Sequence, residues 1–325
     1  MRIPSLLVAI CASLAIAGPL AAQAPSNFPT KPLKLVVPFA PGGTADSVAR
    51  LVGSALADRV GQPVVVENKP GVGGVLAADF VAKAPGDGYT LLMGDVGPNA
   101  VAAGLFPNLP YDALKDFSPV ALATTVPMLL MVSPKVPAAD LSELLALGRA
   151  TPGSLNFASA GAGGISHLVG EMLKIQSGVD MVHVPYKNGS QALIDLKSGE
   201  VQLMFATATT GLPQVKSGNT KPMAVASSKR LDYLPDVPTM AEAGLPGFVA
   251  DSWSGILVPS STPAAVVEYL GQVLAEVLNQ ADVKESLTQR GFEVLAGSPA
   301  EFSDFLSREV AKWTGVIQAA GVKLE

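Results

Sequence analysis

A strand that ends in a Pro-Gly-Gly turn and runs directly into a helix constrains this chain more than any other feature. The apolar, β-branched run 35–39 is typical of a buried strand. Gly42 and Gly43 follow it, and apolar residues then recur at helical spacing over 45–56. At such a turn the first amides of the helix lack acceptors, glycine lets a ligand approach the backbone, and the helix dipole favours negative charge. The turn contains no Lys or Arg, so the sequence predicts an anion site built mainly from backbone amides; an ordinary glycine-capped βα turn is the alternative.

The first 24 residues have the pattern of a secretory signal peptide. Arg2 gives a positive start, 6–17 is an apolar run too short for a stable anchor, and Ala22 and Ala24 offer small residues for cleavage. Its removal would take away Cys11, the only cysteine, and one positive charge from a chain of net charge −5. The mature chain would then hold no disulfide and no cysteine-based metal site. We therefore expect the protein to be exported to the periplasm.

The rest of the chain predicts an α/β protein with two lobes. Strands alternate with helices over short loops, which is typical of a doubly wound parallel sheet. We expect one lobe from 25–125 together with 249–325, a second lobe from 126–248, two strand crossings between them and a ligand cleft where they meet. The acidic balance and the absence of a basic patch argue against a nucleic-acid partner.

Three expectations along the chain are more specific. We expect 99–116 to be a loop, because it is rich in Pro, Gly and Asn. We expect two strand pieces, 120–123 and 128–133, separated by Thr-Thr-Val-Pro. The run 253–258 is the candidate for the second crossing between the lobes.

A second glycine turn mirrors the first. It follows the strand 155–158 and leads from Ser159 into a helix that contains His167. Ser159 with His167 as base suggests a secreted α/β hydrolase, but the nucleophile elbow needs Gly where Phe157 stands. His183 alternates with apolar residues on a strand and is interpreted as structural. The sequence has no His pair at i, i+4 and no EF-hand spacing, so we expect no metal and no cofactor.

Several long motifs in this sequence carry a resemblance to a known family. They are Val36–Asp46, Val65–Gly71, Asp87–Leu92, Leu109–Asp112, Lys115–Phe117, Val184–Lys187, Leu234–Thr239, Ala241–Gly244 and Lys312–Trp313. Together they resemble the Bug family, the substrate-binding proteins of tripartite tricarboxylate transporters, over essentially the whole mature chain.

This resemblance implies a type II-like periplasmic binding protein whose two Rossmann-like lobes close on a small organic carboxylate. It further implies a monomer that delivers its ligand to the membrane permease subunits of such a transporter. Carried over residue by residue, the ligand contacts implied are Phe39, Ala40, Gly42, Gly43, Thr44, Asp46, Gly94, Asp95, Ser159, Ala160, Gly161, Gly163, His167, Tyr186 and Thr207. Ala40, Gly164 and Asn188 depart from the residues usual in the family. A receptor that signals instead of feeding a transporter is a further alternative.

Asp95 follows the third strand of the first lobe, where the resemblance places the choice of ligand. A carboxylate there would repel a second anionic group on the ligand and favour a hydroxyl or an amine. The alternative is that Asp95 caps the segment that begins at Gly97. Asp46, near the start of the first helix, has a similar alternative as a capping acid.

Overall fold

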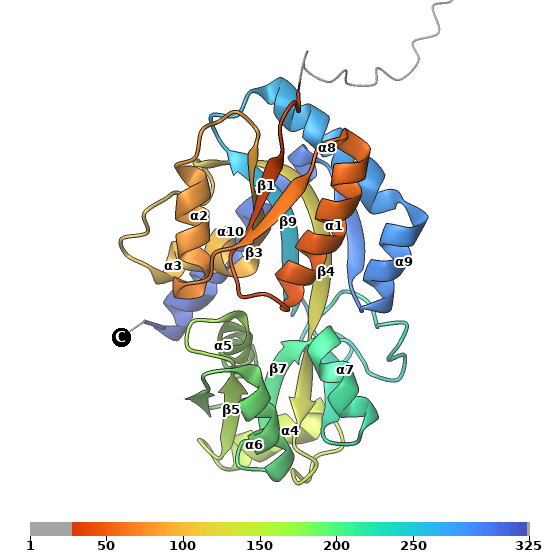
Figure 1. The fold of residues 1–325 in the computed structure, drawn as a ribbon. Coiled ribbons are helices and arrows are strands. Elements are labelled where there is room, and N and C mark those ends of the chain that lie inside the picture. The colour runs from red at the N-terminus through yellow and green to blue at the C-terminus, as the bar shows by residue number, and fades with distance from the viewer. Residues whose placement is uncertain (1–27, 324–325) are drawn as a thin grey trace, which may run out of the picture.

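The computed structural model describes residues 28–323 and shows two lobes, one above the other, joined by a long central strand (Figure 1). The predicted signal peptide, residues 1–24, lies outside the described residues. Both ends of the described chain belong to the larger, upper lobe. The α/β class and the two-lobed architecture predicted from the sequence are confirmed.

The first lobe takes its elements from both halves of the chain. They are β1 (Leu33–Val37), α1 (Thr44–Val60), β2 (Val64–Asn68), α2 (Val75–Ala82), β3 (Thr90–Asp95), α3 (Ala102–Leu105), β9 (Asp251–Pro259), α8 (Ala264–Asn279), α9 (Ala281–Gln289), β10 (Glu293–Gly297) and α10 (Pro299–Ala320). The second lobe is continuous in sequence. Its elements are α4 (Leu141–Ala150), β5 (Leu155–Ser159), α5 (Ile165–Ser177), β6 (Met181–Pro185), α6 (Gly189–Ser198), β7 (Leu203–Thr207), α7 (Ala208–Lys216) and β8 (Lys221–Val225).

The strand β4 (Phe117–Val132) connects the lobes and pairs with strands of both. Within residues 28–323 the sheet has ten strands in the order β2-β1-β3-β9-β4-β7-β5-β6, with β8 and β10 paired to β4 off this path. The strands β1, β2 and β3 are parallel, as are β5, β6 and β7. Their carboxyl ends therefore lie on the side of each lobe where binding sites of such sheets form.

The expectation of two strand pieces between 120 and 133 was wrong. β4 is one strand of 16 residues, which exchanges its partners instead of breaking. Pro127 is the last residue paired with β9, and Met128 is the first paired with β7. Proline lacks an N–H for the ladder, so it fits at this change of partner, and the neighbouring Thr124 and Thr125 are buried in the strand.

The second crossing lies just before the run that the sequence suggested. β9 pairs with β3 and β4 inside the first lobe, so 253–258 does not itself cross. The chain returns at Ala250, whose carbonyl accepts from Met128 and whose amide donates to Ala226. The lobe boundaries expected at 125/126 and 248/249 remain a prediction.

Two further segments differ from the sequence-based expectation. The supposed loop 99–116 begins with a π-helical turn at Gly97–Val101 that continues into α3, and this turn is buried. The strand β10 was not predicted. It is short and irregular, with Leu295 exposed, the other four residues half-buried and Ala296 at a φ of 48°.

Apolar side chains on the two faces of the sheet form two cores that extend through both lobes. In β1, for example, Leu35 belongs to one core and Val36 to the other, which explains the continuous apolar run of this strand. The C-terminal helix α10 contacts β4 and α3 of the first lobe and also α5 of the second. It is therefore a second connection between the lobes, beside the crossing strand.

Candidate functional site

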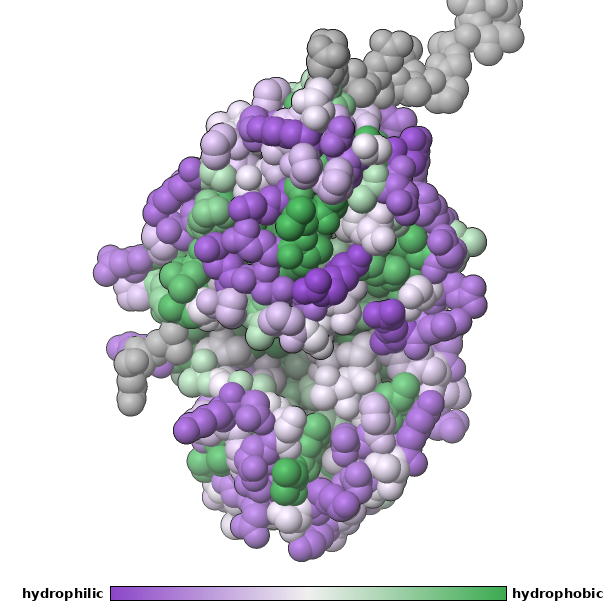
Figure 2. All heavy atoms as spheres, in the orientation of Figure 1, coloured by the Kyte–Doolittle hydropathy of each residue, from purple (hydrophilic) through white to green (hydrophobic). Residues whose placement is uncertain are grey.

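The two glycine turns lie at the ends of the lobes that face each other. α1 begins at the lower end of the first lobe, and α5 lies at the upper end of the second (Figure 1). The surface is hollowed between the lobes, and pale residues of intermediate hydropathy line much of this furrow (Figure 2). This is the cleft that the sequence predicted, and its pale visible lining contrasts with the mixture of strongly polar and strongly apolar patches on the surface around it.

The first turn presents backbone amides at the start of a long helix. Gly43 is the N-cap of α1 with extended backbone, and no side chain caps the helix there. The amides of Thr44 and Ala45 have no acceptor within the helix because they belong to its first turn. A Cβ on Gly43 would meet no atom closer than the Ala40 carbonyl oxygen, at 3.7 Å. The turn therefore leaves open space over its amides, as an anion site requires.

Asp46 holds this turn from inside. Its carboxylate accepts from the Gly42 amide at 2.8 Å, from Arg50 Nε at 3.0 Å and from Asn68 Nδ2 at 2.9 Å. Burial acts to raise the pKa of Asp46, but the hydrogen bonds from Arg50, Gly42 and Asn68 outweigh it and lower the pKa to about 2. Asn68 also donates to the Phe39 carbonyl at 3.0 Å. With these donors around it, Asp46 shapes the loop, and its role as a direct ligand contact is an expectation that this geometry does not favour.

Asp46→Asn should therefore destabilise the protein by on the order of 2 kcal/mol at pH 7, because the lowered pKa is a stabilising charge interaction. A carboxylate whose pKa is lowered by folding stabilises the protein at pH values above its pKa in the unfolded chain. This stabilisation is lost as the pH falls through its pKa in the folded protein, which is about 2. The difference from wild type, measured by urea unfolding, should shrink between pH 5 and pH 2. Asp58→Asn, an exposed site on the same helix, serves as the control. If Asp46→Asn lowered the free energy of unfolding by the same amount at pH 5 and at pH 2, the stabilising charge interaction of Asp46 would be contradicted.

At the end of β3, Asp95 is buried and lies close to the first turn. Its Oδ1 accepts from the Gly97 amide at 3.1 Å, and its own amide donates to Asn99 Oδ1 at 3.2 Å. A Cβ on Gly97 would lie 3.7 Å from both Asp95 Oδ1 and Phe39 Cζ. Asp95 thus caps the segment that begins at Gly97 through its Oδ1, as the alternative interpretation expects. Burial raises the pKa of Asp95 to about 7, against the Gly97 hydrogen bond, so the charge of this carboxyl changes near neutral pH, and its predicted role in the choice of ligand stays a prediction.

Gly94 is packed tightly against the neighbouring strand, which is a structural reason for glycine at this position. A Cβ there would lie 2.3 Å from Leu257 Cδ1 and 3.2 Å from the Gly255 carbonyl oxygen of the neighbouring strand β9, so the packing leaves little room for a side chain. Its predicted role in ligand binding stays a prediction.

The second turn is organised by side chains that donate or accept inside the loop. The amide of Ala160 donates to Ser166 Oγ at 3.0 Å, and the amide of Gly163 donates to His167 Nδ1 at 3.0 Å. Gly164 is the N-cap of α5, again without a side-chain cap. The amides of Ala160 and Gly163 are therefore occupied, and the outward donors are those at the start of α5, beginning at Ile165.

Ser159 pairs with His183 and not with His167, which overturns the pairing behind the hydrolase alternative. Ser159 Oγ lies 2.6 Å from His183 Nε2 and 3.0 Å from the Gly161 carbonyl oxygen. The hydroxyl has one proton, which it can give to the Gly161 carbonyl oxygen or, when His183 Nε2 is unprotonated, to that imidazole. Ser159 is also completely buried. The interpretation of His183 as structural agrees with this arrangement.

The two imidazoles stack under the turn. Their ring centroids are 3.6 Å apart, and His167 Nε2 lies 3.6 Å from Glu171 Oε1. Burial, followed by the neighbouring His167, lowers the pKa of His183 to about 4. His183 is therefore neutral at physiological pH, and it supports the loop through a hydrogen bond without bringing a charge.

The remaining predicted residues lie at the carboxyl ends of β6 and β7. The Tyr186 hydroxyl donates to Asp195 Oδ2 at 2.8 Å, and burial, then Asp195, raises the pKa of Tyr186 to about 12. Thr207 Oγ1 lies 3.0 Å from the hydroxyls of Thr209 and Thr210 at the start of α7. Both side chains thus have partners within the lobe.

Sequence reasoning did not assign a site role to Asn68, Arg50 or Ser166. Asn68 lies in one of the motifs quoted above, and the parallel pairing of Val37 with Asn68 places it beside the first turn. Within residues 28–323 no group of three or more His, Cys, Asp or Glu side chains could hold a metal ion. In the same range, no helix combines the length and apolar character that a membrane crossing requires.

Comparisons with known proteins agree with this geometry. Residues 48–322 match the family model described as the tripartite tricarboxylate transporter family receptor. Protein BugT of Bordetella pertussis is 36% identical over 326 residues, which cover 100% of both chains. The structure of an R. palustris protein with adipate superposes with a TM-score of 0.80 at 35% identity, over 91% of this chain and 99% of that one. MatC from Rhodopseudomonas palustris with bound malate gives a TM-score of 0.77 at 38% identity, over 89% and 100%. The chain therefore belongs to the tripartite tricarboxylate transporter receptor family, and it is a solute-binding protein similar to the Bug proteins.

Proposed function

We propose that this protein is a periplasmic receptor that takes up a small organic carboxylate between its lobes and delivers it to the permease of a tripartite tricarboxylate transporter. One observation carries the proposal: two long helices begin at opposed glycine turns with no side-chain cap. Amides of this kind bind carboxylates through hydrogen bonds that strengthen with the negative charge of the ligand. The adipate and malate bound by two similar proteins make dicarboxylates the first candidates.

The mechanism requires the closed arrangement to gain contacts that the open one lacks, since otherwise a ligand could not shift the equilibrium. A carboxylate that reaches the amides of both turns would provide such contacts. The crossing strand β4 and the return at Ala250 are the segments about which the lobes would move. The permease would then recognise the closed form.

Binding without conversion is the expected result when residues 25–325 are purified and screened against carboxylates. Adipate or malate should raise the melting temperature, and the methyl esters should not, because esterification removes the charge. Mass spectrometry after incubation with stoichiometric protein should recover the acid unchanged.

Two outcomes would contradict the proposal. Conversion of the acid that is lost in Ser159→Ala would show an enzyme. Equal stabilisation by acid and ester would show that the amides do not form an anion site. The transport step has its own test, since uptake by vesicles that carry the permease should depend on the receptor.

A further inference from the structure

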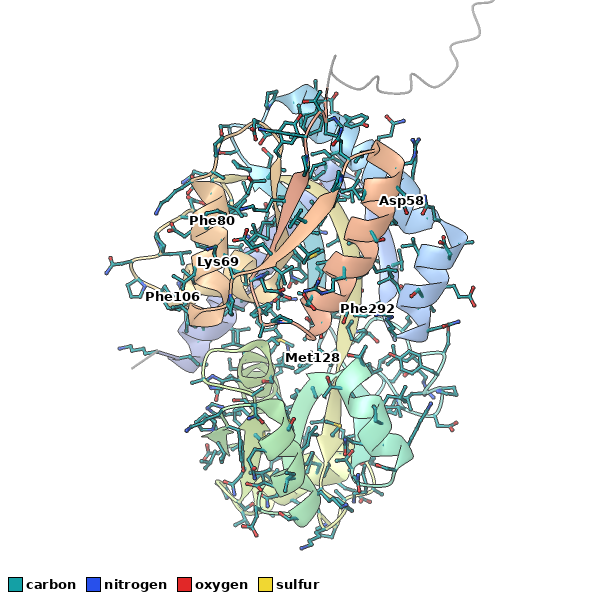
Figure 3. The ribbon with its side chains drawn as sticks, in the orientation of Figure 1. Asp58, Lys69, Phe80, Phe106, Met128 and Phe292 are labelled. Atoms are coloured by element: carbon teal, nitrogen blue, oxygen red, sulfur yellow. The ribbon has the colours of Figure 1, made fainter. Side chains whose placement is uncertain are left out.

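A second cavity lies beside the cleft, between α7 of the second lobe and α9 with β10 of the first. Its volume is about 850 Å³, within the range of small-molecule sites. None of the fifteen ligand contacts implied by the sequence lines it. Thr209 does, and its hydroxyl lies 3.0 Å from that of Thr207, so the two sites are neighbours. Phe292 lies on the first-lobe side, and Met128 marks the junction of the lobes (Figure 3).

The charge of this cavity is opposite to that of the whole protein. Five basic residues and two acidic residues line it, in a chain of net charge −5. Two of the basic residues have partners: Lys229 pairs with Glu293 at 2.7 Å, and Arg230 pairs with Glu242 at 2.9 Å. The other three, Lys216, Lys284 and Arg290, make no ion pair or side-chain hydrogen bond with any residue between 28 and 323.

Helix dipoles do not explain all three of these cations. Lys216 ends α7 and Arg290 caps the end of α9, where positive charge is favoured anyway. Lys284, however, lies in the first half of α9, where the helix dipole does not favour a cation. The dipole of α9 therefore does not explain why a lysine stands at this position on the cavity wall.

The three cations come from both lobes. Lys216 belongs to the second lobe, whereas Lys284 and Arg290 belong to the first. The lobes touch between them, since a Cβ on Gly291 would lie 3.0 Å from Thr209 Cγ2. A ligand held by cations from both lobes would favour this relative position of the lobes over others.

We propose that this cavity is a second binding site, for a small multivalent oxyanion such as a polycarboxylate or a phosphate. It differs from the glycine turns in its means of recognition, because it offers exposed charged side chains in place of backbone amides. Several separated cations favour a ligand with several negative groups over a simple monocarboxylate.

The test uses Gly43→Val as background, so that binding at the glycine turns does not obscure the result. Citrate, inorganic phosphate and acetate are titrated by calorimetry at constant ionic strength. We expect citrate or phosphate, but not acetate, to bind with a stoichiometry of one. Tighter binding of citrate would assign polycarboxylates as the ligand class, and tighter binding of phosphate would assign phosphates.

In that background, Lys284→Gln with Arg290→Gln should weaken binding at least tenfold. Lys197→Gln, an exposed lysine in the last turn of α6 outside the cavity, should leave it unchanged. The melting temperatures of both variants without ligand show that they are folded. Binding that is absent in the Gly43→Val background, or is as tight in the double variant, would overturn the second site. Neither result would affect the proposed carboxylate site.

Discussion

Gly43→Val is expected to weaken carboxylate binding at least 100-fold while the protein remains folded. The added side chain would stand over the amides of Thr44 and Ala45, and two hydrogen bonds to a charged group account for about 3 kcal/mol or more. The fold itself should tolerate the change. Gly43 has a φ of −81° and a ψ of 179°, which is extended backbone open to any residue, and the nearest atom to its Cβ is 3.7 Å away.

Calorimetry with adipate and malate measures the loss of affinity, and thermal unfolding measures the cost to the fold. Gly43→Ala should give an intermediate loss, because its methyl group covers less of the amides. Gly315→Ala, in open space on α10, is the remote control and should bind as wild type does. Undiminished affinity in Gly43→Val would show that the ligand does not approach this turn.

Much of the fold follows from local pattern. The continuous apolar run of β1, the glycine after it and the apolar stripe of α1 each agree with the structure, because a strand buried on both faces and an amphipathic helix leave clear periodicities. β4 was harder to predict. Its Thr-Thr-Val-Pro segment has the composition of a break, and only the exchange of partners at Pro127 keeps the strand continuous.

The positions of the two turns could be predicted from the sequence, but the partners of their side chains could not. Ser159 and His183 are 24 residues apart and meet because β5 pairs with β6 in a register that aligns Phe157 with His183. A shift of one residue in that register would turn His183 to the other face of the sheet. Likewise, Asp46 has a capping position in the sequence, whereas its contact with Asn68 depends on the pairing of β1 and β2.

Burial also changes chemistry in ways that a sequence does not reveal. Asp46 and Asp95 are both buried, yet the pKa of Asp46 is lowered to about 2 and that of Asp95 is raised to about 7. Asp46 has Arg50 and two further donors, whereas Asp95 has the Gly97 amide as its one hydrogen-bond donor among the described residues. The stronger desolvation of Asp95, together with its fewer donors and the lack of a cation like Arg50 beside it, decides which carboxyl stays charged.

Asp95→Asn should remove a pH dependence from both stability and ligand binding. A carboxyl whose pKa is raised from 3.8 to about 7 keeps a proton in the folded state that the unfolded chain has lost. Asp95 therefore destabilises the folded protein increasingly as the pH rises from about 4 to 7. Above pH 7 the variant should be more stable than the wild type by on the order of 2–4 kcal/mol. Urea unfolding between pH 4 and pH 8 measures this difference.

The same proton should affect dicarboxylates, because Asp95 is buried at the end of β3 beside the first turn. Below pH 7 a protonated Asp95 can donate to a second carboxylate of the ligand, whereas above pH 7 its charge repels that group. We expect the affinity for adipate or malate to fall as the pH rises from 6 to 8 in the wild type and to stay nearly constant in Asp95→Asn. Asp58→Asn, at an exposed position of α1 away from the crossings between the lobes (Figure 3), is the control and should leave the pH dependence of both stability and binding as in the wild type. If binding in Asp95→Asn followed the wild-type pH profile, Asp95 would cap the Gly97 segment and have no part in the choice of ligand.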